Sequence, residues 1–361
     1  MADQGNPDLL RVARQLRGLQ QGDAAQLLGI SQAMLSRLEN RLSVFTEEVV
    51  ARAAKAFDLP RTFFIQTDSV LGAPVSVHPM WRKKAAVTAR EMEQIVAELN
   101  LRLMHLRRLL SAVEIEATYS IPALPVDEFE SVERIAALAR AQWQLPAGPV
   151  LNLTRTLEAA GVVVVHSNLA GSAVDGVTFA APGLPPLIVL NASQPADRMR
   201  FTLAHELGHL VMHRTQPTQA MEEQANEFAS YFLMPTQDIR AYYNRRIDLR
   251  LLAELKPVWR VSMASLLMRA RSLGLLAYNQ ERYLWQQFNM AKIRQGEPPE
   301  LDFPAEAATV LPDLIEAHMR QLGYSLADIA GMLHLQADEL GTLYGLSIVP
   351  EAQPRHLRIV K

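Results

Sequence analysis

The residues best suited to chemistry form one short pattern, His205-Glu206-Leu207-Gly208-His209, inside a stretch with helical periodicity. Residues four apart share one face of a helix, so both imidazoles can bind a single metal ion. Glu206 lies between them and is placed to act as general base on a water activated by that metal. The pattern therefore predicts a zinc site with hydrolytic chemistry, and manganese is the alternative metal.

A catalytic zinc site needs a third protein ligand, which we expect on the helix that follows. Glu222 and Asn226 are four residues apart and share a helix face. Glu222 is therefore the expected third ligand, and Asn226 is expected to hydrogen-bond a ligand histidine. Glu223 and Glu227 form a second pair with the same spacing, which we interpret as a solvated face.

Two further residues near this pattern are ambiguous or excluded. His213 lies one helical turn beyond His209, and three roles stay open for it: stabilising an oxyanion, acting as an alternative ligand, or capping the helix C-terminus. Tyr231 would point about 180° away from Glu222 and is not expected in the site. Gly208 would allow a neighbouring element to approach the helix closely.

Composition narrows the class of protein. The 361 residues contain no cysteine, which excludes disulfide scaffolds, Cys-ligated zinc fingers, iron–sulfur sites and cysteine nucleophiles. The net charge is −2. The excess of acidic residues is confined to residues 121–240, which contain 12 acidic and 7 basic side chains. No stretch reaches the roughly 18 apolar residues that a membrane span needs. We expect a cytoplasmic protein with no membrane partner.

The first 66 residues have a different pattern, that of several short helices. Gly29-Ile30 would form a turn, after which Ser31 would cap a second helix over residues 32–38, as in a helix-turn-helix. Residues 1–65 carry a net charge of only +1, so a bundle used for dimerisation alone is the alternative. The expected DNA contacts are Gln21 to a phosphate, and Gln32, Ala33, Ser36, Arg37 and Asn40 on or just beyond the second helix.

Both regions resemble known families. The stretch Ser31-Gln-Ala-Met-Leu-Ser-Arg-Leu-Glu-Asn40, within residues 8–66, resembles the XRE (Cro/repressor-type) helix-turn-helix family. Over roughly residues 130–290, the chain resembles the ImmA/IrrE family of metallopeptidases. Three motifs carry this resemblance: Arg200-Phe-Thr-Leu-Ala-His-Glu-Leu-Gly-His-Leu-Val-Met-His213, Glu222-x-x-x-Asn226 and Phe232-Leu-Met-Pro235.

The second resemblance implies a zincin-like core, in which a small sheet supports the H-E-x-x-H helix. It also implies that His205, His209 and Glu222 are the zinc ligands and that Glu206 is the catalytic base. The reaction it implies is the site-specific cleavage of a transcriptional repressor.

The expected fold is α+β and mostly helical, with strands near residues 161–166, 176–180 and 187–191. We expect a helix-turn-helix domain over residues 1–66, a helical connector over 67–120, a metallopeptidase domain over 121–290, and a linker with a helical module over 291–361. Helices are expected near residues 88–112, 131–141, 152–160, 197–213, 219–233, 248–255, 262–273 and 313–344.

The last module contains a faint repeat of the first domain. A shift of 305 residues aligns Gly18 with Gly323 and Leu28 with Leu333. The second helix of this copy carries acidic residues. It has Thr342 at the position that aligns with Arg37, so it lacks a basic side chain there. We interpret the copy as a structural or interaction module.

Together these patterns predict a DNA-binding transcriptional regulator with a zinc-dependent endopeptidase domain. Its expected partners are operator DNA and a repressor protein as substrate, or the chain itself, and a homodimer would double the DNA contacts. One alternative is a transcription factor whose peptidase-like domain senses a metal or ligand and cuts nothing. Another is an antirepressor that displaces a partner by binding alone.

Overall fold

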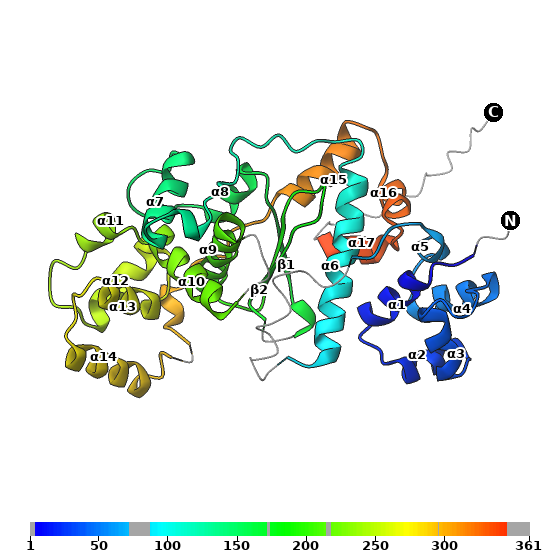
Figure 1. The fold of residues 1–361 in the computed structure, drawn as a ribbon, viewed down its shortest axis with the longest axis horizontal. Helices are drawn as coiled ribbons and strands as arrows, with labels where there is room; N and C mark the ends of the chain where they lie inside the picture. Colours follow the sequence, from blue (N-terminus) through cyan, green and yellow to red (C-terminus); the bar gives the residue numbers. More distant parts are fainter. Residues whose placement is uncertain (1–3, 72–86, 172–173, 214–217, 295, 345–361) are drawn as a thin grey trace, which may run out of the picture. The chain divides into compact units, whose positions relative to one another are not determined.

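A computed structural model describes residues 4–71, 87–171, 174–213, 218–294 and 296–344. Its contacts group the chain into two units (Figure 1). The first unit comprises residues 1–70, 104–113 and 311–361, and the second comprises residues 71–103 and 114–310. Helix α6 (Ala89–Leu109) contributes residues to both units.

Among its described residues, the first unit contains helices and connecting loops and no strand. Thr88 and Glu91 form a capping box at the start of α6, in the part of that helix that belongs to the second unit, with Thr88 N–H donating to Glu91 Oε2 at 2.7 Å. The other helices of this unit are α1 (Pro7–Leu16), α2 (Gln21–Leu28), α3 (Gln32–Glu39), α4 (Glu47–Phe57), α5 (Arg61–Ile65), α15 (Val310–Arg320), α16 (Leu326–Leu333) and α17 (Ala337–Tyr344).

The predicted helix-turn-helix forms between α2 and α3. Gly29 has a φ of +63°, a left-handed conformation that glycine adopts without steric cost, and it ends α2. Ser31 caps α3 by accepting a hydrogen bond from the Met34 N–H at 3.2 Å. Beneath them, Arg14 Nε donates to Glu39 Oε1 at 2.6 Å, and both side chains are buried. This ion pair joins α1 to α3.

The second unit contains a three-stranded sheet covered by helices. The strands are β1 (Val163–Ser167), β2 (Gly176–Phe179) and β3 (Leu187–Asn191), in the order β1-β3-β2. β3 pairs in parallel with β1 and antiparallel with β2, which leaves β2 at one edge. The helices are α7 (Val132–Gln142), α8 (Leu153–Ala159), α9 (Ala196–Met212), α10 (Gln219–Leu233), α11 (Thr236–Arg240), α12 (Leu249–Trp259), α13 (Met263–Ser272) and α14 (Tyr278–Met290).

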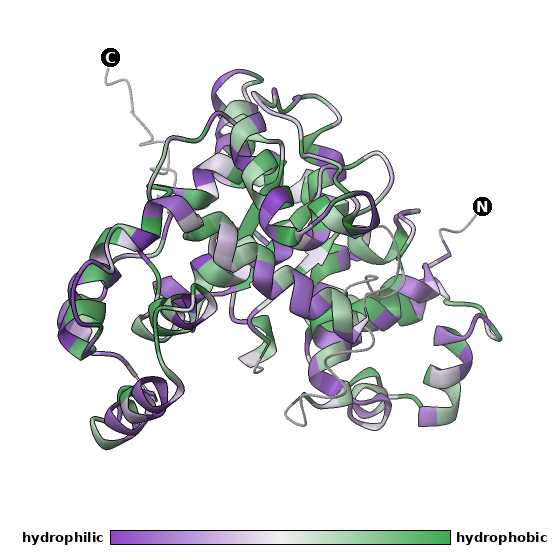
Figure 2. Cartoon of the chain, turned by 60° about the vertical axis from the view of Figure 1, so that its left-hand side comes forward, coloured by the Kyte–Doolittle hydropathy of each residue, from purple (hydrophilic) through white to green (hydrophobic). Residues whose placement is uncertain are grey.

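Helix α9 packs against α10 and against strands β2 and β3 of the sheet. Its residues Leu203, Leu207 and Val211 are buried in one hydrophobic core. Gly208 permits the close approach of α10, because a Cβ atom there would lie 3.1 Å from Phe228 Cδ1. Figure 2 shows that most helices carry both hydrophobic and hydrophilic residues, as expected of helices with one buried side.

The expected mostly helical α+β fold is confirmed, with corrections to individual elements. Helix α14 had not been predicted. Helix α12 continues through Pro257 to Trp259, four residues beyond the predicted end. The helical segment predicted over residues 313–344 consists of three helices, separated near Gly323 and near His334, both with positive φ.

The proline-rich stretch over residues 296–309 is attached to α8 and α13 by hydrogen bonds to carboxylates. Glu297 accepts hydrogen bonds from the Met263 and Ala264 N–H groups, and Glu306 accepts one from the Thr154 N–H at 2.7 Å. Glu158 accepts the Thr309 N–H at 2.9 Å. These bonds hold the stretch against both ends of α8 and against the N-terminus of α13. Among the described residues, no helix has the length and apolar character to cross a membrane.

Candidate functional site

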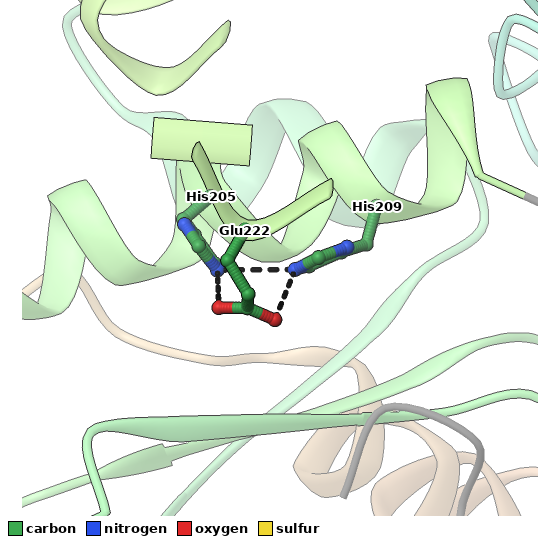
Figure 3. A group of neighbouring side chains, drawn as sticks. All are labelled: His205, His209 and Glu222. Atoms are coloured by element: carbon green, nitrogen blue, oxygen red, sulfur yellow. Dashed lines mark hydrogen bonds and ion pairs between the residues drawn. The ribbon is translucent and has the colours of Figure 1, made fainter. Parts of the chain in front are cut away.

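His205, His209 and Glu222 converge in the second unit. One ligand atom from each lies within 4.8 Å of the others (Figure 3). The two Nε2 atoms are 3.1 Å apart. Glu222 Oε2 lies 3.4 Å from His205 Nε2, and Glu222 Oε1 lies 3.3 Å from His209 Nε2. Three donors therefore face a common point, as the sequence pattern predicts.

Two helices position these donors. The i, i+4 spacing places both histidines on one side of α9. Thr218 caps α10 by accepting the Met221 N–H at 3.3 Å, so Glu222 lies in the first turn of α10. The contact of Gly208 with Phe228 brings α10 close enough for Glu222 to span both imidazoles.

Hydrogen bonds fix Nδ1 of His205 and of His209, the ring nitrogen that does not face the cluster. His205 Nδ1 lies 3.1 Å from Asn226 Oδ1, the partner that the sequence predicts. His209 Nδ1 lies 2.9 Å from His213 Nδ1, and His213 Nε2 lies 3.1 Å from Gln224 Oε1. A proton on each of His205 Nδ1, His209 Nδ1 and His213 Nε2 satisfies these contacts, which leaves both ligand Nε2 atoms unprotonated for a metal.

His213 thus contacts a ligand histidine through its ring while its backbone caps the end of α9. Burial, together with the charge of His209, lowers the pKa of His213 to about 4. A neutral ring can accept the His209 N–H. The sequence gives no local signal for Gln224, because its contact with His213 depends on how α9 meets α10.

Charge around the three donors favours an ionised carboxylate. Burial raises the pKa of Glu222, but hydrogen bonds to His205 and His209 outweigh it and lower the pKa overall. Burial lowers the pKa of His205, whereas Glu222 and the charge of Glu206 raise it more. An anionic oxygen and two imidazole nitrogens are the donor set that catalytic zinc accepts, so the residues present fit the metal.

Glu206 lies next to this cluster and is buried, with 7% of its surface exposed. Thr178 on β2 donates its hydroxyl to Glu206 Oε2 at 2.6 Å. This bond fixes the carboxylate and leaves Oε1 as the oxygen that can take a proton. Thr178 was not among the predicted site residues, because the sequence places it only on a strand.

A cleft of about 300 Å³ opens over the cluster. Glu223 is exposed and lines it, whereas Glu227 is exposed and is not part of its lining. Tyr231 lies elsewhere, with its ring 4.4 Å from the Arg269 guanidinium carbon. The cleft is lined by Val87, Val174, Asp175, Gly176, Arg198, Phe201, Thr202, His205, Glu206, His209, Gln219, Glu222, Glu223 and Asn226.

The expected DNA-contact residues lie on or near α3 in the first unit. Gln32, Ala33, Arg37 and Asn40 are exposed, and Ser36 is half-buried. Arg37 Nε donates to Ser43 Oγ at 3.2 Å. The Gln21 side chain, predicted to bind a phosphate, donates to Glu39 Oε2 at 2.8 Å and so also contributes to the buried ion pair.

The fold and the cluster define a metallopeptidase-type domain joined to a helix-turn-helix. Comparison with family models agrees with this class: residues 157–271 match the IrrE N-terminal-like domain, and residues 10–64 match a helix-turn-helix domain. No curated protein matches the chain. Over these two ranges the chain is therefore similar to an XRE-type helix-turn-helix domain and to an IrrE-like peptidase domain, the combination that the sequence motifs predict.

Proposed function

We propose that the protein is a transcriptional regulator whose second unit is a zinc-dependent endopeptidase. Its substrate would be a repressor protein, or this chain itself, and cleavage would relieve repression. The helix-turn-helix would bring the peptidase to operator DNA, which also implies a cytoplasmic location. A homodimer would double the contacts of a domain with low net charge.

His205, His209 and Glu222 would hold the metal, with zinc favoured over manganese. When bound, zinc would polarise the scissile carbonyl and lower the pKa of a water molecule. Glu206 would take a proton from the attacking water and deliver it to the leaving amine. Thr178 would hold Glu206 in position during both transfers.

The observation that carries this proposal is the buried, hydrogen-bonded Glu206 beside the donor cluster. A domain that only senses a metal needs the three ligands. It does not need a carboxylate oriented at the edge of the same cleft. An oriented base therefore favours hydrolysis over sensing.

The test compares three forms of the full chain: wild type, Glu206→Gln and His205→Ala. Each is incubated with zinc and with candidate helix-turn-helix repressors, and the products are identified by mass spectrometry. We expect Glu206→Gln to bind zinc and cut nothing, and His205→Ala to lose zinc binding as well.

Cleavage that persists in Glu206→Gln would refute the catalytic assignment. A regulatory effect on transcription that survives this substitution would instead support a non-cleaving sensor or an antirepressor that acts by displacement.

The DNA-binding part of the proposal rests on the exposed side chains of α3. Gln32 and Arg37 are polar and exposed where a recognition helix contacts bases. Replacing Arg37 with Ala should weaken operator binding and relax specificity at one base pair by about 1–3 kcal/mol. Binding is measured at several salt concentrations, because the phosphate contacts depend on salt.

A further inference from the structure

The cleft contains a guanidinium that the proposed catalytic chemistry does not use. Arg198, in the first turn of α9, lines the cleft, and 55% of its side chain is exposed. We propose that Arg198 is a specificity-determining residue that binds the carboxylate of an aspartate or glutamate in the substrate. This inference rests on the proposed peptidase function and specifies the class of substrate for that site.

The guanidinium of Arg198 is held in place by a carboxylate from the sheet side of the cleft. Its Nη2 lies 2.9 Å from Asp175 Oδ1 and donates to Asp175 Oδ2 at 3.0 Å. Asp175 directly precedes β2, and its carbonyl accepts the Asn191 N–H at 2.9 Å. The Asn191 side chain also donates to the carbonyl of Val174 at 2.8 Å. The end of β3 thus fixes the turn that carries Asp175, and Asp175 in turn orients Arg198.

Both contacts with Asp175 use a single nitrogen of the guanidinium. A guanidinium carries five N–H donors in one plane, so it can bind a second carboxylate while it keeps the first. Within the part of the chain that the structure describes, the side-chain hydrogen bonds of Arg198 come from Nη2 alone. Nε and Nη1 are therefore available to a substrate group, and their planar arrangement matches the two oxygens of a carboxylate.

The position of Arg198 along α9 sets which substrate residue it can contact. The cleft lining follows α9 from Arg198 through His205 to His209. A rise of about 1.5 Å per residue places Arg198 about 10 Å from His205 along the helix axis. An extended peptide advances about 3.3 Å per residue. A substrate that lies along α9 with its scissile carbonyl at the donor cluster therefore brings a side chain roughly two to four residues away next to Arg198.

The charges around Arg198 determine how large the preference should be. Asp175 offsets the charge of Arg198, so long-range attraction for an acidic substrate is small. Glu206 and Glu222 lie at the donor cluster, about one Debye length away, and their repulsion is largely screened. The preference must therefore come from direct, charge-assisted hydrogen bonds to a partly exposed guanidinium. We expect it to be about fivefold in kcat/KM, as for an exposed ion pair.

A library of synthetic peptides of defined sequence tests the preference without knowledge of the natural substrate. The zinc-loaded full chain is incubated with the library, and each cut is located by mass spectrometry. We expect Asp and Glu to be enriched at one position roughly two to four residues from the cut. Cuts that show no such enrichment would overturn the inference.

Peptides that differ only at the enriched position separate specificity from a structural role. Wild type should cut the Glu peptide about fivefold faster than the Gln peptide. Arg198→Ala should cut both peptides at the rate at which wild type cuts the Gln peptide, and Arg198→Glu should prefer a Lys peptide. If Arg198→Ala slows the Glu and Gln peptides equally, Arg198 has only a structural role and the inference is wrong.

Arg155→Ala is the matched control. Arg155 is exposed on α8, and it is not among the described residues that line the cleft. This variant should keep the wild-type preference for the Glu peptide, and every variant should bind zinc as wild type does. An equal loss of preference in Arg155→Ala and Arg198→Ala would overturn the inference, because it would show an effect of surface charge in general.

The same experiments distinguish failure of this inference from failure of the proposed function. If peptides are cut without a preference for acidic residues, the assignment of Arg198 is wrong and the peptidase assignment stands. If only a repressor protein is cut, an Asp or Glu must lie at the same spacing from its cut, and a cut without one overturns the inference. If the zinc-loaded chain cuts neither peptides nor repressors, both are wrong.

Discussion

Replacing Gly208 with Ala tests whether the packing of α9 on α10 sets the metal site. The added Cβ would lie 3.1–3.2 Å from three atoms of Phe228, tighter than ordinary van der Waals contact. Phe228 is fully buried and stacks on Phe232 at 5.5 Å, so its ring has little room to move. The two helices must therefore separate by a few tenths of an ångström.

The magnitude follows from two opposing effects. Ala is favoured over Gly in a helix by about 1 kcal/mol. Overpacking a filled core costs about 1–3 kcal/mol, so the net loss of stability should be about 1 kcal/mol. Metal sites tolerate distance changes of about 0.2 Å, so moving Glu222 away from the histidines should weaken zinc binding by about tenfold.

The assay measures zinc affinity by competition with a chromophoric chelator, and stability by urea unfolding of the metal-free chain. Gly331→Ala is the matched control, because Gly331 is inside α16 and a Cβ there meets nothing within 4 Å. The control should bind zinc as wild type does and gain up to about 1 kcal/mol. The reasoning is refuted if Gly208→Ala binds zinc like wild type and is at least as stable.

Three further predictions concern other contacts. Asn226→Ala should lower zinc affinity by about 10–100-fold in the same chelator assay without changing the circular dichroism spectrum, because His205 loses the bond at Nδ1. Glu39→Ala should destabilise the first unit by about 3–5 kcal/mol, seen as a lower urea midpoint, because the buried Arg14 loses its carboxylate partner; an unchanged midpoint would contradict this. Burial lowers the pKa of His166, so below about pH 6.5 the unfolded chain binds a proton more readily than the folded chain, and the free energy of unfolding should decrease as the pH is lowered. His166→Gln should flatten this dependence in urea titrations between about pH 7.5 and pH 5.5, and an equally steep dependence in the variant would exclude His166 as its source.

Helices with a strong local pattern could be predicted from the sequence, and α14 shows where that fails. Its buried anchors are Leu284 and Phe288, one turn apart, among mostly polar and aromatic residues. Such a segment has a weak periodic signal of hydrophobic residues. The helix packs against α12, and this contact cannot be predicted from the sequence. Tertiary packing thus overrides a low local preference.

Pro257 and the stretch after α14 illustrate the same limit. Proline in the last turn removes one backbone hydrogen bond, yet α12 continues because Trp259 becomes fully buried. The stretch around Glu306 is fixed by bonds to residues about 150 positions earlier, such as Thr154. Separations of that length leave no periodic trace in the sequence.

What the sequence determined by itself is the local geometry of the site: the spacing of His205 and His209 on one helix, and the same spacing of Glu222 and Asn226 on the next. Helical periodicity fixes such neighbours because the backbone repeats every 3.6 residues. Only the tertiary structure decided that Thr178 would hold Glu206, because that bond joins a strand to a helix 28 residues later. The packing of separate elements set that contact, and packing depends on the shape of the whole core.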